Sequence, residues 1–280
     1  MKPRNLQEAL KDKLTEEEFT ELGRAFDIIG DIAILKMSGA LLPKKQLIGE
    51  ALMSVHHNIK TILLQTSPVK GEYRTRNLEH VAGENRTETI HAEHGCKLKV
   101  DIAKTYFSPR LATERLRTAK LVKPGETIIN MFAGVGSYSI IIAKHSQAAK
   151  IYSIDLNPSA VEYMTENIRI NKFGSRIIPI FGDAREVIET HLKKTADRVI
   201  MPLPENAKNF LDSAVKALKP SGGIIHLYDF GQEPDLFGPT LKFAREAIPN
   251  REIELAGKSV VRTYAPKTYH IVLDIAVSRE

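Results

Sequence analysis

The 280-residue chain is poor in several residue types: it has one cysteine, Cys96, no tryptophan, and aromatic side chains at 6% of its positions. A single cysteine excludes a disulfide framework and a cysteine-rich metal centre, and it favours a reducing compartment. No apolar run approaches membrane-spanning length, and the first residues, MKPRNLQEALKDK, have no apolar signal core. We therefore expect a cytoplasmic protein that binds no metal and is not anchored in a membrane.

What the chain does have is a basic charge balance and enough apolar residues for a core. The formal net charge is +6 and the isoelectric point is about 9.2, which favours a polyanionic partner. Hydrophobic residues make up 42% of the sequence, and its length suits one large domain together with a smaller one.

The stretch Glu126–Ser139, ETIINMFAGVGSYS, carries the first ligand-binding signal. Its pattern predicts a short apolar strand over 127–132, a glycine turn over 133–136 and then a helix. A strand that leads through glycines into a helix start lets the backbone approach a ligand and directs N–H groups toward it. The third glycine of a dinucleotide-binding turn is replaced by Ser139, so this stretch alone is a weak indication of a cofactor.

Two further predicted strands end near acidic residues. The strand Lys150–Asp155 (KIYSID) ends 21 positions after Gly134, where a carboxylate suits a ribose diol because it can accept both hydroxyl protons. The strand Arg176–Phe181 (RIIPIF) is followed by Gly182-Asp183. Each signal alone can be an ordinary turn. Together, at the carboxyl ends of successive strands, the three predict an adenosine cofactor at the switch point of a doubly wound sheet.

The first hundred residues predict a small α+β module with no cofactor signal. Its expected elements are a helix over 5–22 with a cap at Thr15, two short strands within 26–36, a helix over 43–56, a buried strand over 61–65, a polar loop over 71–77, and a hairpin of 88–94 with 97–103.

From Pro124-Gly125 onward, strand and helix patterns alternate to the end of the chain. Five alternating units closed by a terminal strand pair are typical of a class I methyltransferase rather than of a nicotinamide dehydrogenase. We therefore predict an α/β protein with a small α+β domain at 1–104 and a methyltransferase domain at 105–280. The remaining expected elements are helices capped by Asn157 and Asp183, a strand over 197–201, a helix containing Phe210 and Ala214, a strand over 222–228, and strands over 252–263 and 268–277.

A helix is expected to begin at Ser108-Pro109, with the serine as N-cap and the proline at the first helical position. Arg110, Glu114 and Arg117 fall on one face of this helix. Their spacing alone favours an ordinary solvated pair of Arg110 with Glu114, worth about a few tenths of a kcal/mol.

The run YFSPRLATER (106–115), beside the glycine turn, is much more specific. With it the chain resembles the archaeal and eukaryotic family that methylates N1 of guanosine 37, next to the tRNA anticodon, using S-adenosylmethionine. It is also similar to the sister branch that builds wyosine-type bases at the same nucleotide. The other matching stretches are GEYRTRNLEHVAGE (71–84), TIHAEHGCKLKVDIAKTYFSPRLATERLR (89–117), NMFAGVGSYSI (130–140), IDLNPSAVEYMTENIRIN (154–171), DRVIMPLPENAKNFL (197–211) and RTYAPKTYHIVLD (262–274).

The resemblance implies a Rossmann-like class I methyltransferase domain preceded by a small β-rich domain, with tRNA as the partner. The chain is expected to act as a monomer and to lack the family's extra N-terminal module, which grips the outer corner of the tRNA. The cofactor, S-adenosylmethionine, is expected at positions that match the family's binding residues: Phe132, Ala133, Gly134, Gly136, Asp155, Leu156, Asp183 and Ala184.

The resemblance also implies catalytic roles that make chemical sense. N1 of guanine carries a proton and is a poor nucleophile until a base removes it, after which negative charge develops on O6. The family's base corresponds to Glu114, and its partner for O6 corresponds to Arg74. For Arg74 and Arg76 the alternative from the residues alone is a solvated loop pair. The positions that match those holding the nucleotide and its phosphates are Tyr106, Arg110, Arg115 and Pro204.

Three positions depart from the family pattern. Asn130 replaces an acid and Ser137 replaces a proline, and neither change removes the backbone of the turn. Pro202 replaces a catalytic-site asparagine, so a side-chain donor to the guanine edge is lost. Proline here resembles the archaeal branch that also methylates C7 of the tricyclic wyosine intermediate, so we consider that second activity. Two further alternatives stay open: a wyosine-pathway aminocarboxypropyl transferase with the same cofactor, and a catalytically inactive RNA-binding protein of the same fold.

Overall fold

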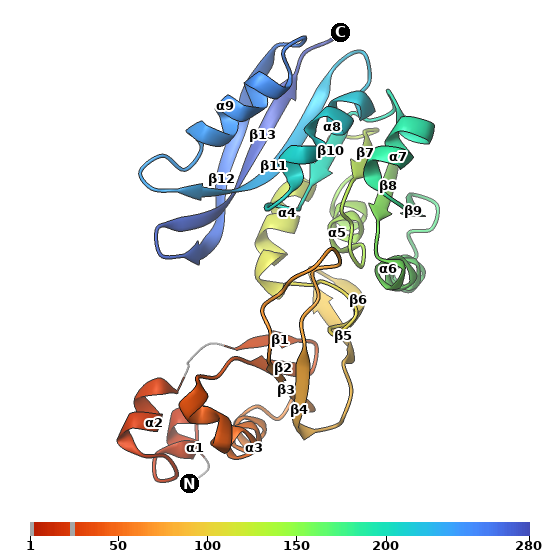
Figure 1. Cartoon of the computed structure of the whole chain (residues 1–280). Helices are drawn as coiled ribbons and strands as arrows, with labels where there is room; N and C mark the ends of the chain where they lie inside the picture. The colour runs from red at the N-terminus through yellow and green to blue at the C-terminus, as the bar shows by residue number, and fades with distance from the viewer. Residues whose placement is uncertain (1–2, 23–25) are drawn as a thin grey trace. The chain divides into compact units, whose positions relative to one another are not determined.

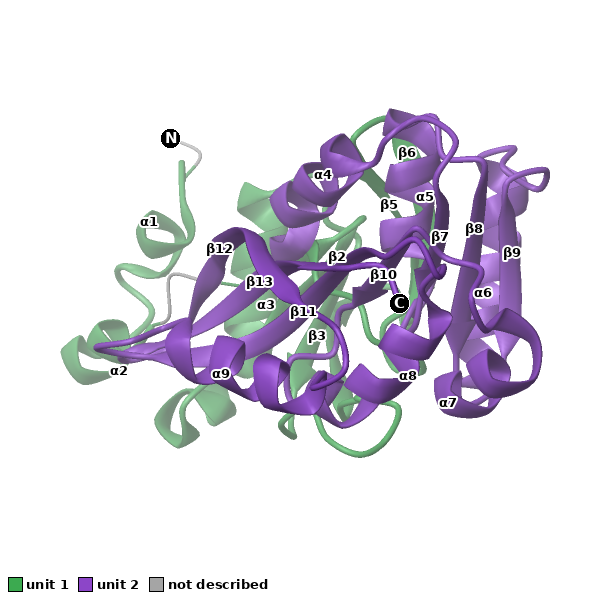
Figure 2. Ribbon diagram, turned by 90° about the horizontal axis from the view of Figure 1, so that it is seen from above, with its two compact units in different colours: residues 1–109 green, residues 110–280 purple. Residues whose placement is uncertain are grey.

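The computed structural model describes residues 3–22 and 26–280 and divides the chain into two compact units (Figure 2). Unit 1 is Met1–Pro109 and unit 2 is Arg110–Glu280. This division falls five residues after the 104/105 boundary expected from the sequence. Among the described residues, no helix combines the length and the apolar content needed to cross a membrane.

Unit 1 contains a four-stranded sheet of order β1-β2-β3-β4 and a separate hairpin, β5-β6 (Figure 1). β2 and β3 are parallel, whereas β1 with β2 and β3 with β4 are antiparallel. The elements are α1 (Leu6–Leu10), α2 (Glu16–Glu21), β1 (Asp27–Ile29), β2 (Ile32–Leu35), the 3-10 helix η1 (Gly39–Lys44), α3 (Lys45–Val55), β3 (Thr61–Gln65), β4 (Leu78–Gly83), β5 (Glu88–Glu93) and β6 (Cys96–Asp101).

Unit 1 differs from the sequence prediction in two places. The single helix expected over 5–22 is two helices, because Thr15 starts a new one. Its side chain accepts the N–H of Glu18, and the Glu18 carboxylate accepts the N–H of Thr15, which is a complete capping box. Strand β4 was not predicted, since its sequence LEHVAG does not alternate apolar and polar residues, and it buries only the adjacent Val81 and Ala82.

Unit 2 is built on a seven-stranded sheet of order β12-β13-β11-β10-β7-β8-β9. Its elements after the 3-10 turn η2 (Pro109–Leu111) are α4 (Ala112–Leu121), β7 (Thr127–Asn130), α5 (Ser137–His145), β8 (Lys150–Asp155), α6 (Pro158–Ile170), β9 (Ile177–Phe181), α7 (Ala184–Val187), the π-helical turn η3 (Ile188–Leu192), β10 (Arg198–Met201), the 3-10 helix η4 (Ala207–Phe210), α8 (Leu211–Ala217), β11 (Gly223–Gln232), α9 (Gly238–Ala247), β12 (Ile253–Ala265) and β13 (Thr268–Val277).

The strand order of unit 2 confirms the predicted fold class. Strands β7 to β11 run parallel, and β13 lies antiparallel between β11 and β12. Because β7 lies between β8 and β10, the strand order reverses at β7. In doubly wound sheets, ligands bind at such a switch point, outside the carboxyl ends of the strands.

The two faces of this sheet differ in chemistry, because alternate residues of each strand point to opposite sides. On one face, Ile129, Val199 and Ile225 join an apolar core with residues of α7, α8 and α9. On the other face, which α4 covers, the strands carry the buried polar residues Arg198 and His226. The face of the sheet that α4 covers therefore carries polar side chains in the protein interior.

Unit 2 also differs from the prediction, and β7 ends at Asn130 rather than at residue 132. Residues 109–111 form the turn η2, so α4 begins later than the expected start at Ser108-Pro109. Strand β11 does not end at Tyr228 but continues to Gln232, because it pairs with β13 as far as Thr268. Helix α9 was not predicted.

Candidate cofactor and active site

The glycine turn joins β7 to α5 at the carboxyl edge of the sheet. Gly136 occupies the N-cap of α5 with a φ of 82°, in the left-handed region that favours glycine. A Cβ on this residue would lie 2.9 Å from Cγ of Met164 in α6. Glycine is therefore required at position 136 by the backbone and by helix packing.

The sequence predicted that the N–H groups of this turn point toward a ligand, but those of Ala133, Gly134 and Gly136 bind acceptors within the protein. The N–H of Gly134 donates to Oδ2 of Asp155 at 2.6 Å, and the N–H of Ala133 donates to the carbonyl of Ile154 at 2.8 Å. The N–H of Gly136 donates back to the carbonyl of Ala133 at 2.9 Å. The turn therefore fixes the carboxylate of Asp155 at the end of β8.

Asp155 is held by main-chain donors on both oxygens. Its Oδ1 accepts the N–H of Asn157 at 2.9 Å, and Oδ2 is bound to Gly134. Burial raises the pKa of Asp155, and the hydrogen bonds from Asn157, Gly134 and Leu156 oppose that shift. Each carboxylate oxygen has two acceptor positions, so Asp155 keeps an acceptor position for a ribose hydroxyl.

Asp183 follows the neighbouring strand β9 and caps α7, as predicted, through the N–H of Arg185 at 2.8 Å. The Arg185 guanidinium also binds both Asp183 oxygens, at 3.0 and 2.6 Å, and these bonds lower the pKa of Asp183. Arg185 lies 4.7 Å from the ring centroid of Phe210, which packs edge-on against Phe132 at 4.9 Å. Leu156, beside Asp155, is half-buried, and Ala184 is buried.

Asn130, at the end of β7, is part of a polar cluster beneath the turn. Its Nδ2 donates to Oγ of Ser139 at 3.1 Å, and the Oγ of Ser153 donates to the same atom at 2.7 Å. Within the described residues, Oδ1 of Asn130 is buried and has no hydrogen-bond partner. Asn130 and Ser139 therefore tie β7, α5 and β8 together.

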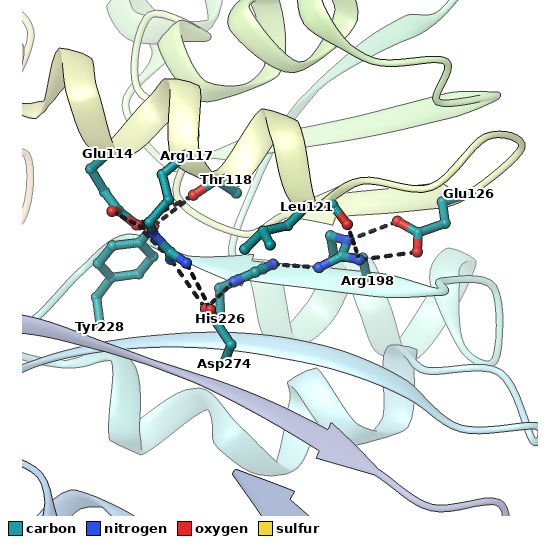
Figure 3. Close-up of polar contacts among 9 residues, drawn as sticks. All are labelled: Glu114, Arg117, Thr118, Leu121, Glu126, Arg198, His226, Tyr228 and Asp274. Atoms are coloured by element: carbon teal, nitrogen blue, oxygen red, sulfur yellow. Dashed lines mark hydrogen bonds and ion pairs between the residues drawn. The ribbon is translucent and has the colours of Figure 1, made fainter. Parts of the chain in front are cut away.

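Glu114 on α4 is buried, with 5% of its surface exposed, and does not form the predicted surface pair with Arg110, whose side chain is exposed. Its partner is Arg117, which binds both carboxylate oxygens at 2.7 and 2.9 Å (Figure 3). The hydroxyl of Tyr228 donates to Oε1 at 2.6 Å, and that of Thr118 lies 3.3 Å from the same oxygen. The surface-pair interpretation was wrong because β11 and β13 close over this face of the helix.

A chain of polar side chains continues from Arg117 across the sheet (Figure 3). Arg117 binds both oxygens of Asp274 at 2.7 and 3.1 Å, and Asp274 lies 2.6 Å from Nδ1 of His226. Nε2 of His226 is 2.7 Å from Arg198, which also binds both oxygens of Glu126 at 2.7 and 3.0 Å. Because arginine can only donate, Nε2 of His226 must accept, and Nδ1–H donates to Asp274.

The charges of this chain follow from the same contacts. Burial lowers the pKa of His226, in agreement with the neutral tautomer that its partners require. Burial raises the pKa of Asp274, but the hydrogen bonds from His226 and Arg117 outweigh it, and the net pKa lies well below the usual range. Glu114, Arg117 and Asp274 therefore form a group in which one half-buried arginine binds two buried carboxyl groups.

Two of the predicted site residues lie together in unit 1. The guanidinium carbon of Arg74 is 5.2 Å from the ring centroid of Tyr106. Arg74 has a φ of 52°, which is uncommon for a residue other than glycine and occurs often at functional sites. Arg76 is half-buried and donates to Gln65 at 3.3 Å. The alternative that Arg74 and Arg76 form a solvated pair in a loop therefore does not hold for Arg76.

The two arginines predicted to contact phosphates, Arg110 and Arg115, differ in exposure. With 1% of its surface exposed, Arg115 is among the largest fully buried side chains described, whereas Arg110 is exposed. Pro202 directly follows β10, and a bond of 2.8 Å from the N–H of Leu203 to the carbonyl of Met201 closes a tight turn around it. Pro202 and Pro204 are half-buried.

Sequence reasoning missed the residues that surround Glu114. Tyr228 and His226 alternate with apolar residues in β11, and Asp274 lies directly opposite His226 in β13. Polar residues at every second position of a central strand were the available signal. The partner strand could not be assigned from the sequence alone.

Two family models match the chain. The TRM5/TYW2 methyltransferase domain matches residues 89–256, and the TYW2 N-terminal domain matches residues 6–87. The methyltransferase model thus includes the hairpin β5-β6, which belongs to unit 1 by its contacts.

Curated relatives come from both branches. The chain is 46% identical to the tRNA (guanine(37)-N(1))-methyltransferase Trm5b of Pyrococcus abyssi, over 92% of this chain and 76% of that protein. It is 37% identical to the tRNA 4-demethylwyosine(37)-methyltransferase Taw21 of Saccharolobus solfataricus, over 91% of this chain and 94% of that protein. It is 35% identical to the tRNA(Phe) (4-demethylwyosine(37)-C(7)) aminocarboxypropyltransferase of Methanocaldococcus jannaschii, over 92% and 100%.

Solved structures from both branches also resemble this chain. Wild-type Trm5b from Pyrococcus abyssi aligns with a TM-score of 0.87 at 44% identity, covering 99% of this chain and 82% of that one. TYW2 from P. horikoshii in complex with MeSAdo aligns with a TM-score of 0.83 at 31% identity, covering both chains completely. Two branches with different reactions therefore resemble this chain over nearly its whole length.

Proposed function

Because the chain belongs to the family defined by the TRM5/TYW2 methyltransferase domain, we propose that it methylates N1 of guanosine 37 in tRNA, with S-adenosylmethionine as the methyl donor. The observation that carries this proposal is the position of Glu114. Its partner Tyr228 is one residue past Leu227, which pairs with Met201 at the end of β10. A buried carboxylate thus lies at the carboxyl edge of the sheet, where the glycine turn and Asp155 also lie.

S-adenosylmethionine is the cofactor of this family, and related structures contain adenosine, AdoMet and MeSAdo. The residues present fit it, since Asp155 keeps acceptor capacity for a ribose and lies beside the glycine turn. Asp155 would hold the ribose, and Phe132, Leu156, Asp183 and Ala184 would surround the adenosine. When bound, the cofactor supplies an electrophilic methyl group on its sulfonium.

Glu114 would remove the N1 proton through Oε2. Among the described residues, Oε1 has Tyr228, Thr118 and Arg117 as neighbours, whereas Oε2 accepts only from Arg117. Oε2 therefore keeps an acceptor position for the proton.

Arg74 would bind O6 as negative charge develops there, since a guanidinium near a forming oxyanion stabilises it. Tyr106, which lies against Arg74, would orient the same nucleotide, and the exposed Arg110 would contact its phosphates. Arg117 and Tyr228 would hold the Glu114 carboxylate in one orientation.

An aminocarboxypropyl transfer with the same cofactor is the second candidate. It is favoured by the match of residues 6–87 to the TYW2 N-terminal domain and by the full coverage of the aminocarboxypropyltransferase relatives. A third candidate is an additional methylation at C7 of the tricyclic intermediate. The half-buried Pro202, which brings no donor to the guanine edge, and the similarity to Taw21 favour it.

The test is incubation of the protein with S-adenosylmethionine and a guanosine-37 tRNA transcript, followed by mass analysis of the nucleosides. We expect one added methyl group at N1 of guanosine. An aminocarboxypropyl increment, or no increment on any substrate, contradicts the proposal. A parallel reaction with tRNA that carries the tricyclic intermediate tests C7 transfer. There Pro202→Asn is expected to suppress the second product while N1 methylation continues.

A further inference from the structure

Three strands of unit 2 extend past the carboxyl edge of the sheet. Strand β10 ends at Met201, opposite Leu227, but β11 continues to Gln232, with β13 paired alongside it and β12 paired with β13 (Figure 1). We name residues 228–232, 262–265 and 268–272 the arm. The arm begins at the edge where the glycine turn and Asp155 lie, so its surface continues the proposed active site.

One face of the arm carries a row of rings. Phe230 lies opposite His270 in the strand register, and His270 lies opposite Arg262. The ring centroids of Tyr228 and His270 are 5.6 Å apart, and those of Phe230 and His270 are 5.8 Å apart. Tyr264 continues the row, with its ring 4.3 Å from Phe230 and tilted by 39°.

The row leads from the proposed base to the surface. Its inner end is Tyr228, which donates to Glu114, and its outer end is Tyr264, which is 52% exposed. The guanidinium carbon of Arg262 lies 5.9 Å from the Tyr264 ring centroid. Arg262 itself is half-buried. An exposed ring that packs against Phe230 thus lies beside an arginine cation.

We propose that the arm is a nucleobase-stacking surface, on which Tyr264 takes an unpaired base next to the nucleotide that is modified. This rests on the proposed function, because it requires tRNA as the partner. Proteins that bind single-stranded RNA stack unpaired bases on aromatic rings and arginine planes, and basic groups beside them bind the phosphates. Arg262 and the exposed Lys267, at the β12–β13 turn, supply that charge.

The absence of tryptophan from the chain gives a direct test. Tyr264→Trp introduces a single indole reporter at the outer end of the row. We expect its fluorescence to be quenched when a guanosine-37 tRNA transcript binds. In a series of transcripts that each carry one abasic nucleotide in the anticodon loop, one abasic position beside nucleotide 37 is expected to remove the quenching.

Binding measurements on the full chain complete the test. Tyr264→Ala is expected to raise the Kd for tRNA about tenfold, within the range for loss of one stacked base. Tyr264→Phe keeps the ring and is expected to stay within twofold of wild type. Val260→Ala is the matched control, because Val260 is exposed on the same strand but pairs with Ile271, which faces the opposite side. Affinity for S-adenosylmethionine is expected to be the same in all variants.

The outcomes separate this inference from the function it rests on. If wild-type protein binds and modifies tRNA but the indole is not quenched, or if Tyr264→Ala and Val260→Ala have the same Kd, the stacking surface is overturned and the proposed function stands. Tight tRNA binding with an aminocarboxypropyl product would overturn the N1 reaction only. If the wild-type protein does not bind tRNA at all, both are overturned.

Discussion

Asp155 and Glu114 are carboxylates at the same edge of unit 2, yet they are held by different kinds of donor. Asp155 accepts main-chain N–H groups from Gly134 and Asn157. Glu114 accepts side-chain donors from Arg117 and Tyr228. Main-chain donors remain when a neighbouring side chain is substituted, whereas a side-chain donor is lost with its residue. The cofactor end of the site therefore depends on the fold, and the proposed base depends on a few specific side chains.

The comparison predicts that the largest effect on rate comes from Glu114. Glu114→Gln keeps a carbonyl oxygen for Tyr228 and Arg117 but cannot take a proton. We expect the single-turnover rate of methyl transfer to fall by roughly 10²–10⁴-fold, the usual contribution of a general base. Cofactor affinity, measured by calorimetry, is expected to stay at the wild-type value. A rate near wild type would leave Glu114 with a structural role only.

The largest effect on stability is expected at Arg117. Arg117→Met leaves the buried carboxylates of Glu114 and Asp274 without their shared cation, and breaking a buried ion pair in this way costs about 3–5 kcal/mol. Urea unfolding measures the difference. The control is Arg169→Met, since Arg169 is exposed and its pair with Glu166 is 3.5 Å long. An exposed pair contributes at most about 1 kcal/mol, so equal losses in the two variants would contradict the importance of the buried group.

Asp155→Ala tests the other carboxylate. Loss of hydrogen bonds from a ribose to a charged acceptor costs about 1.5–3 kcal/mol, so we expect S-adenosylmethionine to bind roughly tenfold to a hundredfold more weakly. Asp212→Ala, an exposed carboxylate on α8, is the control and is expected to bind the cofactor normally. Unchanged affinity in Asp155→Ala would mean that the cofactor is held elsewhere.

The smallest effect concerns the pH dependence of stability. Burial lowers the pKa of His226 from its ordinary value of 6.5, so below that pH the unfolded chain binds a proton that the folded chain does not. Stability is therefore lost as the pH falls from about 6.5 toward 5. His226→Gln removes this proton, and its free energy of unfolding is expected to vary less than that of wild type over the same range. If the free energies of unfolding of wild type and His226→Gln change in parallel over this range, folding does not lower the pKa of His226.

The cofactor end could be predicted from the sequence because its signals are local. The strand Lys150–Asp155 and the caps Asn157 and Asp183 were predicted at the correct positions, since each depends on neighbours within a few residues. The fold class followed from the alternation of strand and helix. What a local pattern cannot give is which N–H groups remain for a ligand, and Gly134 uses its own on Asp155.

The surroundings of Glu114 could not be predicted, because its partners are distant in the chain. Tyr228 is 114 residues away from Glu114, and Asp274 is 157 residues away from Arg117. From helix spacing alone, Glu114 is an exposed residue next to Arg110. The extension of β11 was missed for a related reason: DFGQ is typical of a loop, and only its pairing with β13 makes it a strand.

The most direct test of Glu114 as the base is the pH dependence of the single-turnover rate for wild type and Glu114→Gln, from about pH 6 to about pH 9. If Glu114 removes the N1 proton, the variant must rely on solvent base. Its rate is then expected to rise steeply with pH and to approach the wild-type rate at the alkaline end. A constant ratio between the two rates at every pH would contradict proton removal by Glu114.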